Sequence, residues 1–338
     1  MKSFPGAVAV IALCAACSGP STPMPESARA SAQGPSSTRA RTIRMDIPLE
    51  PDVSDVPRLM AREALQKAGY TVEATAYRDN IVAIQALTTG QVDIAISSLP
   101  NVLAAVQQGA AITVILEGAV HTRRLVTAPE VTTCSDLHNK RVSVPNLVSS
   151  QTLAFRHYLA KECPGTAVEM VFISGAGNRL AALLARRTAG AILDLMTLLE
   201  VQRADGPRFN VLSAFDAEFP GLGGAAVIAP RSFLDRYPAT ARDIVREWLL
   251  ATRKIQDPAV LKDRIEKHLG LAPDRAEAAA ATYLERKVWD RNGGLSDGFM
   301  QRNIDFSVEM GVLKPGMTPA AAEDRRYLNA VLAEIGRQ

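Results

Sequence analysis

The residues with the most useful chemistry in this sequence are small polar side chains that follow predicted strands. They are Ser97, Ser98, Asn146, Ser149, Ser150, Gln151, Thr152 and Ser174. Residues 149–152 open a predicted helix, where hydroxyls and free backbone N–H groups can together bind an anionic group. Either serine could instead only cap its helix, but the segment as a whole favours contact with a ligand.

Carboxylates are the other candidate ligand contacts. Glu50 and Asp52 lie in the loop after the first predicted strand, where they could hold a cationic or amino-bearing ligand or simply be solvated. Asp79 and Asp194 also follow predicted strands, and each could equally be a helix cap or a turn residue. Asp93 is expected to be structural, because it precedes the carboxyl end of its strand.

Other chemistries find little support in the sequence. The four histidines share no metal-ligand spacing with one another or with cysteine, so no metal site is expected. Gly175-Ala176-Gly177 begins like a dinucleotide-binding loop but lacks the third glycine. No phosphate loop, zinc-protease motif or nucleophile elbow is present, so neither a catalytic residue nor a cofactor is predicted. The net charge of +3, without a basic cluster, predicts no nucleic-acid partner.

Strands and helices that alternate along the chain position these residues. In the stretch 86–98, an apolar helix face ends at Gly90 and a short buried strand follows over 92–96. Ser97 and Ser98 stand at the carboxyl end of that strand. Open α/β sheets bind ligands at this edge, beside helix N-termini, so the stretch predicts one wall of a binding site.

Two sets of such elements are predicted. The first is a βαβαβαβ series that begins with a strand over 42–47 and forms a parallel, doubly wound sheet. The second set has strands over 141–144, 168–173 and 190–194, and a further strand covers 225–229. The expected fold class is therefore α/β, with two doubly wound lobes.

The amino-terminal residues read as an export signal. A basic start and an apolar run over 7–16, too short to span a bilayer, lead into Leu13-Cys14-Ala15-Ala16-Cys17. Small residues before a cysteine resemble a bacterial lipobox, which predicts a lipoprotein signal peptide over 1–17 and lipid on Cys17. An ordinary secretory peptide cleaved nearby is the alternative. Residues 18–41 are rich in Ser, Pro, Ala and Gly and are expected to form a flexible tether.

Three segments together resemble a known exported family. Residues 87–96, 135–144 and 227–238 are similar to the substrate-binding component of ABC importers of the nitrate, sulfonate and taurine kind, which includes thiamine-precursor binders. The resemblance implies a type 2 periplasmic binding protein fold, in which strand crossovers at 125–127 and 227–229 join two lobes around a ligand. The implied lobes are residues 42–128 with 225–338, and residues 129–224.

The resemblance also implies a function. The expected protein is a monomeric extracytoplasmic lipoprotein, periplasmic or on the outer face of the membrane, and not an enzyme. It captures a small polar ligand, sulfonate- or nitrate-like, between closing lobes and delivers it to an ABC permease in the membrane. A cofactor-biosynthesis enzyme of the same fold, of the thiamine or menaquinone kind, and an exported ligand sensor are the alternatives.

Two cysteines remain for a disulfide. If Cys14 leaves with the signal peptide and Cys17 carries lipid, then Cys134 and Cys163 are the only cysteines left in an oxidising compartment. Cys134 precedes the strand over 141–144, and the helix that follows this strand runs back and delivers Cys163 to the same end. The sequence therefore predicts a structural disulfide away from the binding site, with two buried free thiols as the alternative.

Overall fold

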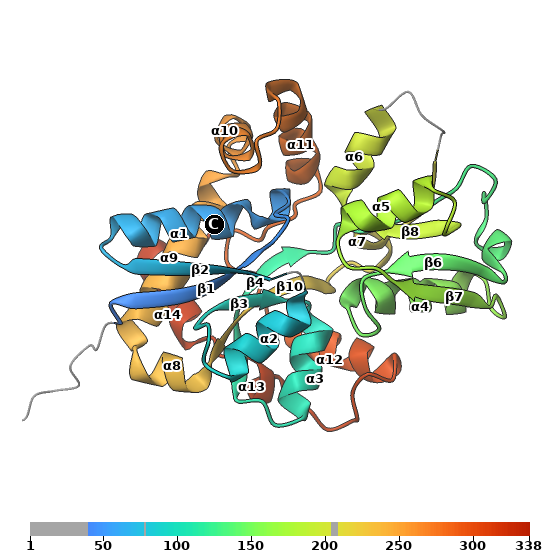
Figure 1. Ribbon diagram of the computed structural model, residues 1–338. Coiled ribbons are helices and arrows are strands. Elements are labelled where there is room, and N and C mark those ends of the chain that lie inside the picture. Colours follow the sequence, from blue (N-terminus) through green and yellow to red (C-terminus); the bar gives the residue numbers. More distant parts are fainter. Residues whose placement is uncertain (1–39, 78, 204–208) are drawn as a thin grey trace, which may run out of the picture. The chain divides into compact units, whose positions relative to one another are not determined.

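The computed structural model describes residues 40–77, 79–203 and 209–338 (Figure 1). The predicted signal peptide over 1–17, the lipidation site at Cys17 and nearly all of the tether over 18–41 lie outside the described residues. Within the part that is described, no helix has both the length and the apolar character needed to cross a bilayer.

The first half of the fold is built on two small sheets joined by a bridge. β1 (Thr42–Pro48) pairs in parallel with β2 (Thr71–Tyr77). A second sheet has the order β3-β10-β4, with β10 antiparallel to both neighbours. A parallel bridge between Met45 and Ile94 links β1 to the start of β3. The bounds of this second sheet's strands are β3 (Ala95–Ser97), β4 (Ile112–Val120) and β10 (Gly223–Pro230).

A five-stranded sheet forms the other half, in the order β7-β6-β8-β5-β9. Its strands are β5 (Arg124–Thr127), β6 (Lys140–Val144), β7 (Val168–Phe172), β8 (Gly190–Leu193) and β9 (Asn210–Ala214). β6 is parallel to β7 and β8, whereas β5 is antiparallel to β8 and β9. The chain enters this sheet at β5 and leaves it between β9 and β10. β5 and β10 contain the strands predicted at 125–127 and 227–229, and their role as crossovers between two lobes stays a prediction. Because both run antiparallel to their neighbours, the sheets are mixed and not wholly parallel.

Helices cover these sheets. Around the first half lie α1 (Val56–Lys67), α2 (Asn80–Thr88), α3 (Leu99–Gln107), α8 (Arg231–Arg236), α9 (Pro238–Lys254), α10 (Pro258–Leu269), α11 (Pro273–Glu285), α12 (Phe299–Glu309), α13 (Pro319–Ala322) and α14 (Arg326–Ile335). The helices that alternate with the strands of the five-stranded sheet are α4 (Ser150–Glu162), α5 (Ala176–Leu184), α6 (Leu195–Arg203) and α7 (Phe215–Glu218). Two single turns, η1 (Val53–Asp55) and η2 (Cys134–Leu137), precede α1 and β6. In Figure 1, α1 and α9 lie beside the blue strands β1 and β2, and α4 and α5 lie beside β6, β7 and β8.

Buried apolar side chains form a cluster within each half and a further cluster that both halves share. One cluster joins β1, β3, β4 and β10 to α9 and α14, and includes Ile43 and Trp248. Another lies between β6, β8 and α4, and includes Phe155. The shared cluster joins Leu195 of α6 to Tyr283 of α11, so each sheet has its own core and the halves also share apolar contacts.

The predicted disulfide is confirmed. Cys134, at the start of η2, is bonded to Cys163, directly after α4, with their Cα atoms 6.1 Å apart. Both are buried in the Phe155 cluster. The bond lies at the amino end of β6, whereas the residues that follow β6, from Pro145 onward, are at its other end.

A carboxyl in β4, Glu117, gives a first prediction although its residue is only partly buried. Glu117 lies against Gly294, where any Cβ atom would clash with the Glu117 side chain. Burial, and to a smaller extent the charge of Asp290, raises the pKa of Glu117 to about 8. The folded protein therefore holds a proton that the unfolded chain loses near pH 4.5, so the stability contributed by Glu117 falls as the pH rises through this window.

We expect Glu117→Gln to remove this pH dependence. Between pH 5.5 and 7.5 the free energy of unfolding of the unmodified protein should fall by about 2 kcal/mol relative to that of Glu117→Gln. Urea unfolding at the two pH values measures the difference. Glu73→Gln, an exposed change on β2, is the control and should leave the two curves parallel. Parallel curves for Glu117→Gln would contradict the prediction.

Candidate ligand-binding site

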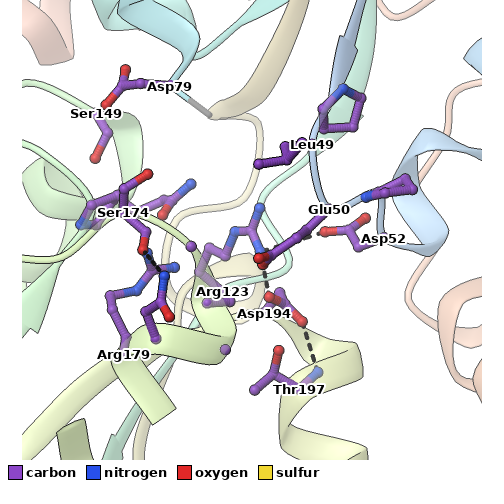
Figure 2. A pocket seen from close by; sticks show the side chains of 18 of the residues that line it. Leu49, Glu50, Asp52, Asp79, Arg123, Ser149, Ser174, Arg179, Asp194 and Thr197 are labelled. Atoms are coloured by element: carbon purple, nitrogen blue, oxygen red, sulfur yellow. Dashed lines mark hydrogen bonds and ion pairs between the residues drawn. The ribbon is translucent and has the colours of Figure 1, made fainter. Parts of the chain in front are cut away.

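A polar cavity of about 610 Å³ collects the loops that follow the strands of both halves (Figure 2). Loops after β1, β2 and β3 line it from the first half, and loops after β6, β7 and β8 line it from the five-stranded sheet. The lining residues that carry a charge are Glu50, Asp52, Asp79, Arg123, Arg179, Asp194 and Glu200. The size is typical of a small-molecule site.

Most of the residues predicted from the sequence lie at this cavity. Those that line it are Glu50, Asp52, Asp79, Ser98, Asn146, Ser149, Gln151, Ser174 and Asp194. Ser97, Ser150 and Thr152 are not among the lining residues. The expectation that a ligand binds at the carboxyl ends of the strands therefore located the cavity. A binding role for each lining residue stays a prediction.

The three exceptions are held inside the protein. Ser97 is fully buried in β3. The Ser150 hydroxyl donates to the carbonyl of Gly224 in β10, with 3.1 Å between the oxygens. The Thr152 hydroxyl donates to the carbonyl of Asn146 at 2.5 Å, and the Thr152 N–H donates to the Ser149 hydroxyl at 3.3 Å. Ser149 thus caps α4, which is the alternative that the sequence left open for it, whereas the Ser150 hydroxyl is held by β10.

Arg123 is the principal site residue that sequence reasoning missed. It lies between β4 and β5, and its Nη1 atom is 3.6 Å from Asp52 Oδ2 and 3.3 Å from Asp194 Oδ2 (Figure 2). The side chain is 21% exposed. One guanidinium therefore connects the loop after β1 with the end of β8. Its position directly before a predicted crossing strand was the only sequence signal.

Asp52 and Asp194 also serve their own helices. Asp52 accepts a hydrogen bond from the backbone N–H of Ser54 at 2.6 Å, and Asp194 accepts one from that of Thr197 at 2.7 Å. Burial, with the nearby charges of Asp55 and Asp194, raises the pKa of Asp52 to about 6, although Arg123 opposes the shift. Asp52 and Asp194 therefore each cap a helix and line the cavity.

Arg179 is a second arginine that the sequence reasoning missed. It belongs to α5, and its guanidinium donates to the carbonyl of Ile192 at 2.6 Å and to that of Ile173 at 3.0 Å. These two carbonyls stand at the ends of β8 and β7. Burial, with repulsion from Arg123, lowers the pKa of Arg179 to about 10, so the side chain is still charged at neutral pH. Its donors are used largely in fixing the site.

Several polar groups at the cavity have no hydrogen-bond partner among the described residues. They are the Ser98 hydroxyl, both polar atoms of the Asn101 amide and the Gln151 amide oxygen. Ser98 is 3% exposed and Asn101 is 5% exposed. Buried polar groups without partners cost free energy, so they mark positions where a ligand can supply the missing bonds. Asn101 was not predicted as a site residue.

The described residues offer no arrangement of three or more His, Cys, Asp or Glu side chains suited to a metal ion. The carboxylates of Asp52 and Asp194 are directed toward Arg123 and toward backbone N–H groups at helix starts. The chemistry on offer is recognition of a polar molecule by hydrogen bonds and charge.

Residues 64–258 match the model of a family described as NMT1/THI5 like. The chain belongs to the NMT1/THI5-like family. This agrees with the resemblance to importer binding proteins that was identified in the sequence. No curated protein sequence matches this member of the family.

Solved structures of low sequence identity share the fold. The ligand-binding component of an ABC-type import system from Staphylococcus aureus, solved with zinc bound, has a TM-score of 0.73 at 15% identity, over 86% of this chain and 99% of that one. The alkanesulfonate-binding protein SsuA from Xanthomonas axonopodis pv. citri, bound to MOPS, has a TM-score of 0.69 at 15% identity, over 85% and 99%. The nitrate-binding protein NrtA from Synechocystis PCC 6803 has a TM-score of 0.68 at 10% identity, over 88% and 89%. The NMT1/THI5-like chain thus has the predicted type 2 periplasmic binding protein fold.

Proposed function

We propose that this protein is the substrate-binding component of an ABC import system and captures a small polar solute in the cavity described above. The observation that carries the proposal is the set of unpartnered polar groups on Ser98, Asn101 and Gln151, within a cavity of about 610 Å³. A pocket whose described residues offer unused hydrogen bonds fits a protein that binds a solute. The similar solved structures include the binding component of an import system and proteins that bind an alkanesulfonate and nitrate, which supports the same assignment.

The proposal includes two lobes, residues 42–128 with 225–338 and residues 129–224, that close on the solute. Each proposed lobe has an apolar cluster of its own, and Leu195 packs with Tyr283 across the division. The Arg123 contacts to Asp52 and Asp194 would be part of the surface that closure brings together. Lipid on Cys17 would hold the protein near an ABC permease, outside the cytoplasm.

A ligand screen tests this function. Purified protein is heated with nitrate, sulfonates, amino acids, organic amines and pyrimidines, each at 10 mM as a rough upper concentration for weak binders. A solute at one hundred times its Kd adds about 2.7 kcal/mol of stability, which raises the melting temperature by several degrees. Small-angle scattering with that solute should show a smaller radius of gyration.

Two results would contradict the proposal. One is that no solute in the panel raises the melting temperature. The other is that a stabilising solute is converted to a product during incubation, which would assign the cavity to an enzyme of the same fold.

The sequence predicts a sulfonate- or nitrate-like anion as the solute, and Ser149 and Gln151 at the start of α4 are the residues that favour it. The charge of the cavity points to a different chemical group.

A further inference from the structure

The charges that line the cavity are strongly unbalanced. Among the described residues that line it, Glu50, Asp52, Asp79, Asp194 and Glu200 carry carboxylates, and Arg123 and Arg179 carry positive charges. Within this described lining, five acids against two arginines leave an excess of up to three negative charges. An anionic solute would add to this excess, and a cationic one would offset it.

Both arginines are already occupied. Arg179 donates to the Ile192 and Ile173 carbonyls. Arg123 lies within ion-pair distance of both Asp52 and Asp194. An anion would share these arginines with the carboxylates or carbonyls that already contact them.

Glu50 is differently placed. It is exposed, and no ion pair joins it to a basic side chain in the described part of the chain. Its Oε2 atom lies 3.4 Å from where a Cβ atom on Gly175 would be, so the carboxylate reaches from the loop after β1 toward the start of α5. Glu50 lines the same cavity as Asp52, Asp194 and Arg123, and Figure 2 draws the four side chains together.

A second, independent observation concerns uncharged polar side chains. Ser98 and Asn101 are almost fully buried at the start of α3, line the same cavity and lack hydrogen-bond partners among the described residues. β1 and β3 are neighbours through the Met45–Ile94 bridge, so the Glu50 loop and the Ser98 position open on the same sheet edge. The cavity is far larger than a metal ion needs. These features call for an organic molecule with its own donors and acceptors.

We propose that the solute carries a protonated amine that binds at Glu50, beside Asp52 and Asp194, and that its uncharged polar atoms bind Ser98 and Asn101. The inference rests on the proposed function and specifies its ligand class as a small organic amine with neutral polar groups. Glu50 supplies the free negative charge, and Asn101 supplies both a donor and an acceptor.

The test combines the solute panel with site variants. In the unmodified protein, the solutes that raise the melting temperature should carry a protonated nitrogen. For the best of them, titration calorimetry should show that Glu50→Gln weakens binding by about 10- to 100-fold, because it removes one charge-assisted hydrogen bond. Glu50→Asp should recover part of the affinity, and Glu73→Gln on β2 is the matched control that should change nothing.

Asn101→Ala tests the proposed contact between Asn101 and the uncharged polar atoms of the solute. The melting temperature without solute should stay the same or rise, because the unpaired amide is removed, while affinity for the same amine falls. A fall in affinity with no fall in stability is not what a structural role would give.

The remaining outcomes separate the two proposals. If only nitrate, sulfonates or other anions stabilise the protein, the amine inference is wrong and the binding function stands. Full affinity for an amine in Glu50→Gln also overturns the inference. If nothing in the panel binds, both proposals fail.

Discussion

Replacing Arg123 with methionine is expected to lower the free energy of unfolding by about 3 kcal/mol at pH 7.5. The guanidinium lies 3.6 Å from Asp52 Oδ2 and 3.3 Å from Asp194 Oδ2, and the Asp194 side chain is only 6% exposed. Methionine fills a similar volume without the charge. The variant therefore leaves two neighbouring carboxylates in a poorly solvated site with no cation, and that costs more than the original pair contributes.

The pH dependence separates this mechanism from a packing defect. Burial already raises the pKa of Asp52 to about 6, and loss of Arg123 removes the group that lowers it. In Arg123→Met the pKa of Asp52 should rise further, so at pH 5 the carboxyl is protonated and the repulsion is relieved. A raised carboxyl pKa makes the folded state bind more protons than the unfolded one, so stability falls as the pH rises.

Urea unfolding at pH 5.0 and pH 7.5 measures both effects. The loss caused by Arg123→Met should be clearly smaller at the lower pH, and adding Asp52→Asn should recover part of the stability at pH 7.5. Arg242→Met is the control, because Arg242 forms an exposed pair with Glu334 that should contribute less than about 1 kcal/mol. An equal loss at both pH values would show that shape, and not charge, is what Arg123 provides.

The location of the cavity could be predicted from the sequence because it follows from local rules. Polar residues that follow short apolar strands gather at the ends of those strands: Ser98 after β3 in one sheet, and Asn146 and Asp194 after β6 and β8 in the other. A helix cap also depends on near neighbours: Asp79 caps α2 by accepting a hydrogen bond from the Ile81 N–H at 2.7 Å. These features depend on neighbours a few residues away.

What could not be predicted depends on distant parts of the chain. Ser149 and Ser150 stand in the same helix-start pattern, but Ser150 is drawn inward because the Gly224 carbonyl of β10 lies beside α4. Arg123 has no local signature, since its role arises only when Asp52 and Asp194 arrive from different strands. Apolar runs do not reveal strand direction, so the antiparallel course of β5 and β10 was not contained in their pattern. The strand β9 was missed for a related reason, because Asn210–Ala214 is short and only partly buried at the sheet edge.

The sign of the cavity's charge is a further non-local property. Glu50 and Asp52 were recognised as a complication for an anionic ligand, yet each carboxylate alone could have been solvated. An amine is favoured because Glu50 and Asp52 line the same cavity as Asp194, and because both arginines there already contact other groups.

Removing the Cys134–Cys163 disulfide is expected to lower the free energy of unfolding by about 3–4 kcal/mol. The bond closes a loop with a sequence separation of 29 residues, which spans η2, β6 and α4. Crosslinking limits the conformations of the unfolded chain, and a loop of this length sets the size of the effect. The double variant Cys134→Ala/Cys163→Ala is preferred, because a single change leaves a thiol that can pair with another molecule.

Two measurements distinguish the crosslink from the packing of the cysteine side chains. Both residues are buried beside Phe155, so alanine also removes a small amount of apolar contact. Reducing the unmodified protein breaks the bond but keeps both sulfurs in place, so reduced protein should lose nearly as much stability in urea as the double variant. Because the bond lies at the opposite end of β6 from the cavity, solute affinity should be the same in the oxidised protein and in the double variant, at a temperature where both are folded. A double variant that is destabilised while the reduced protein is not would assign the effect to packing, and a changed affinity would show that the bond shapes the binding site.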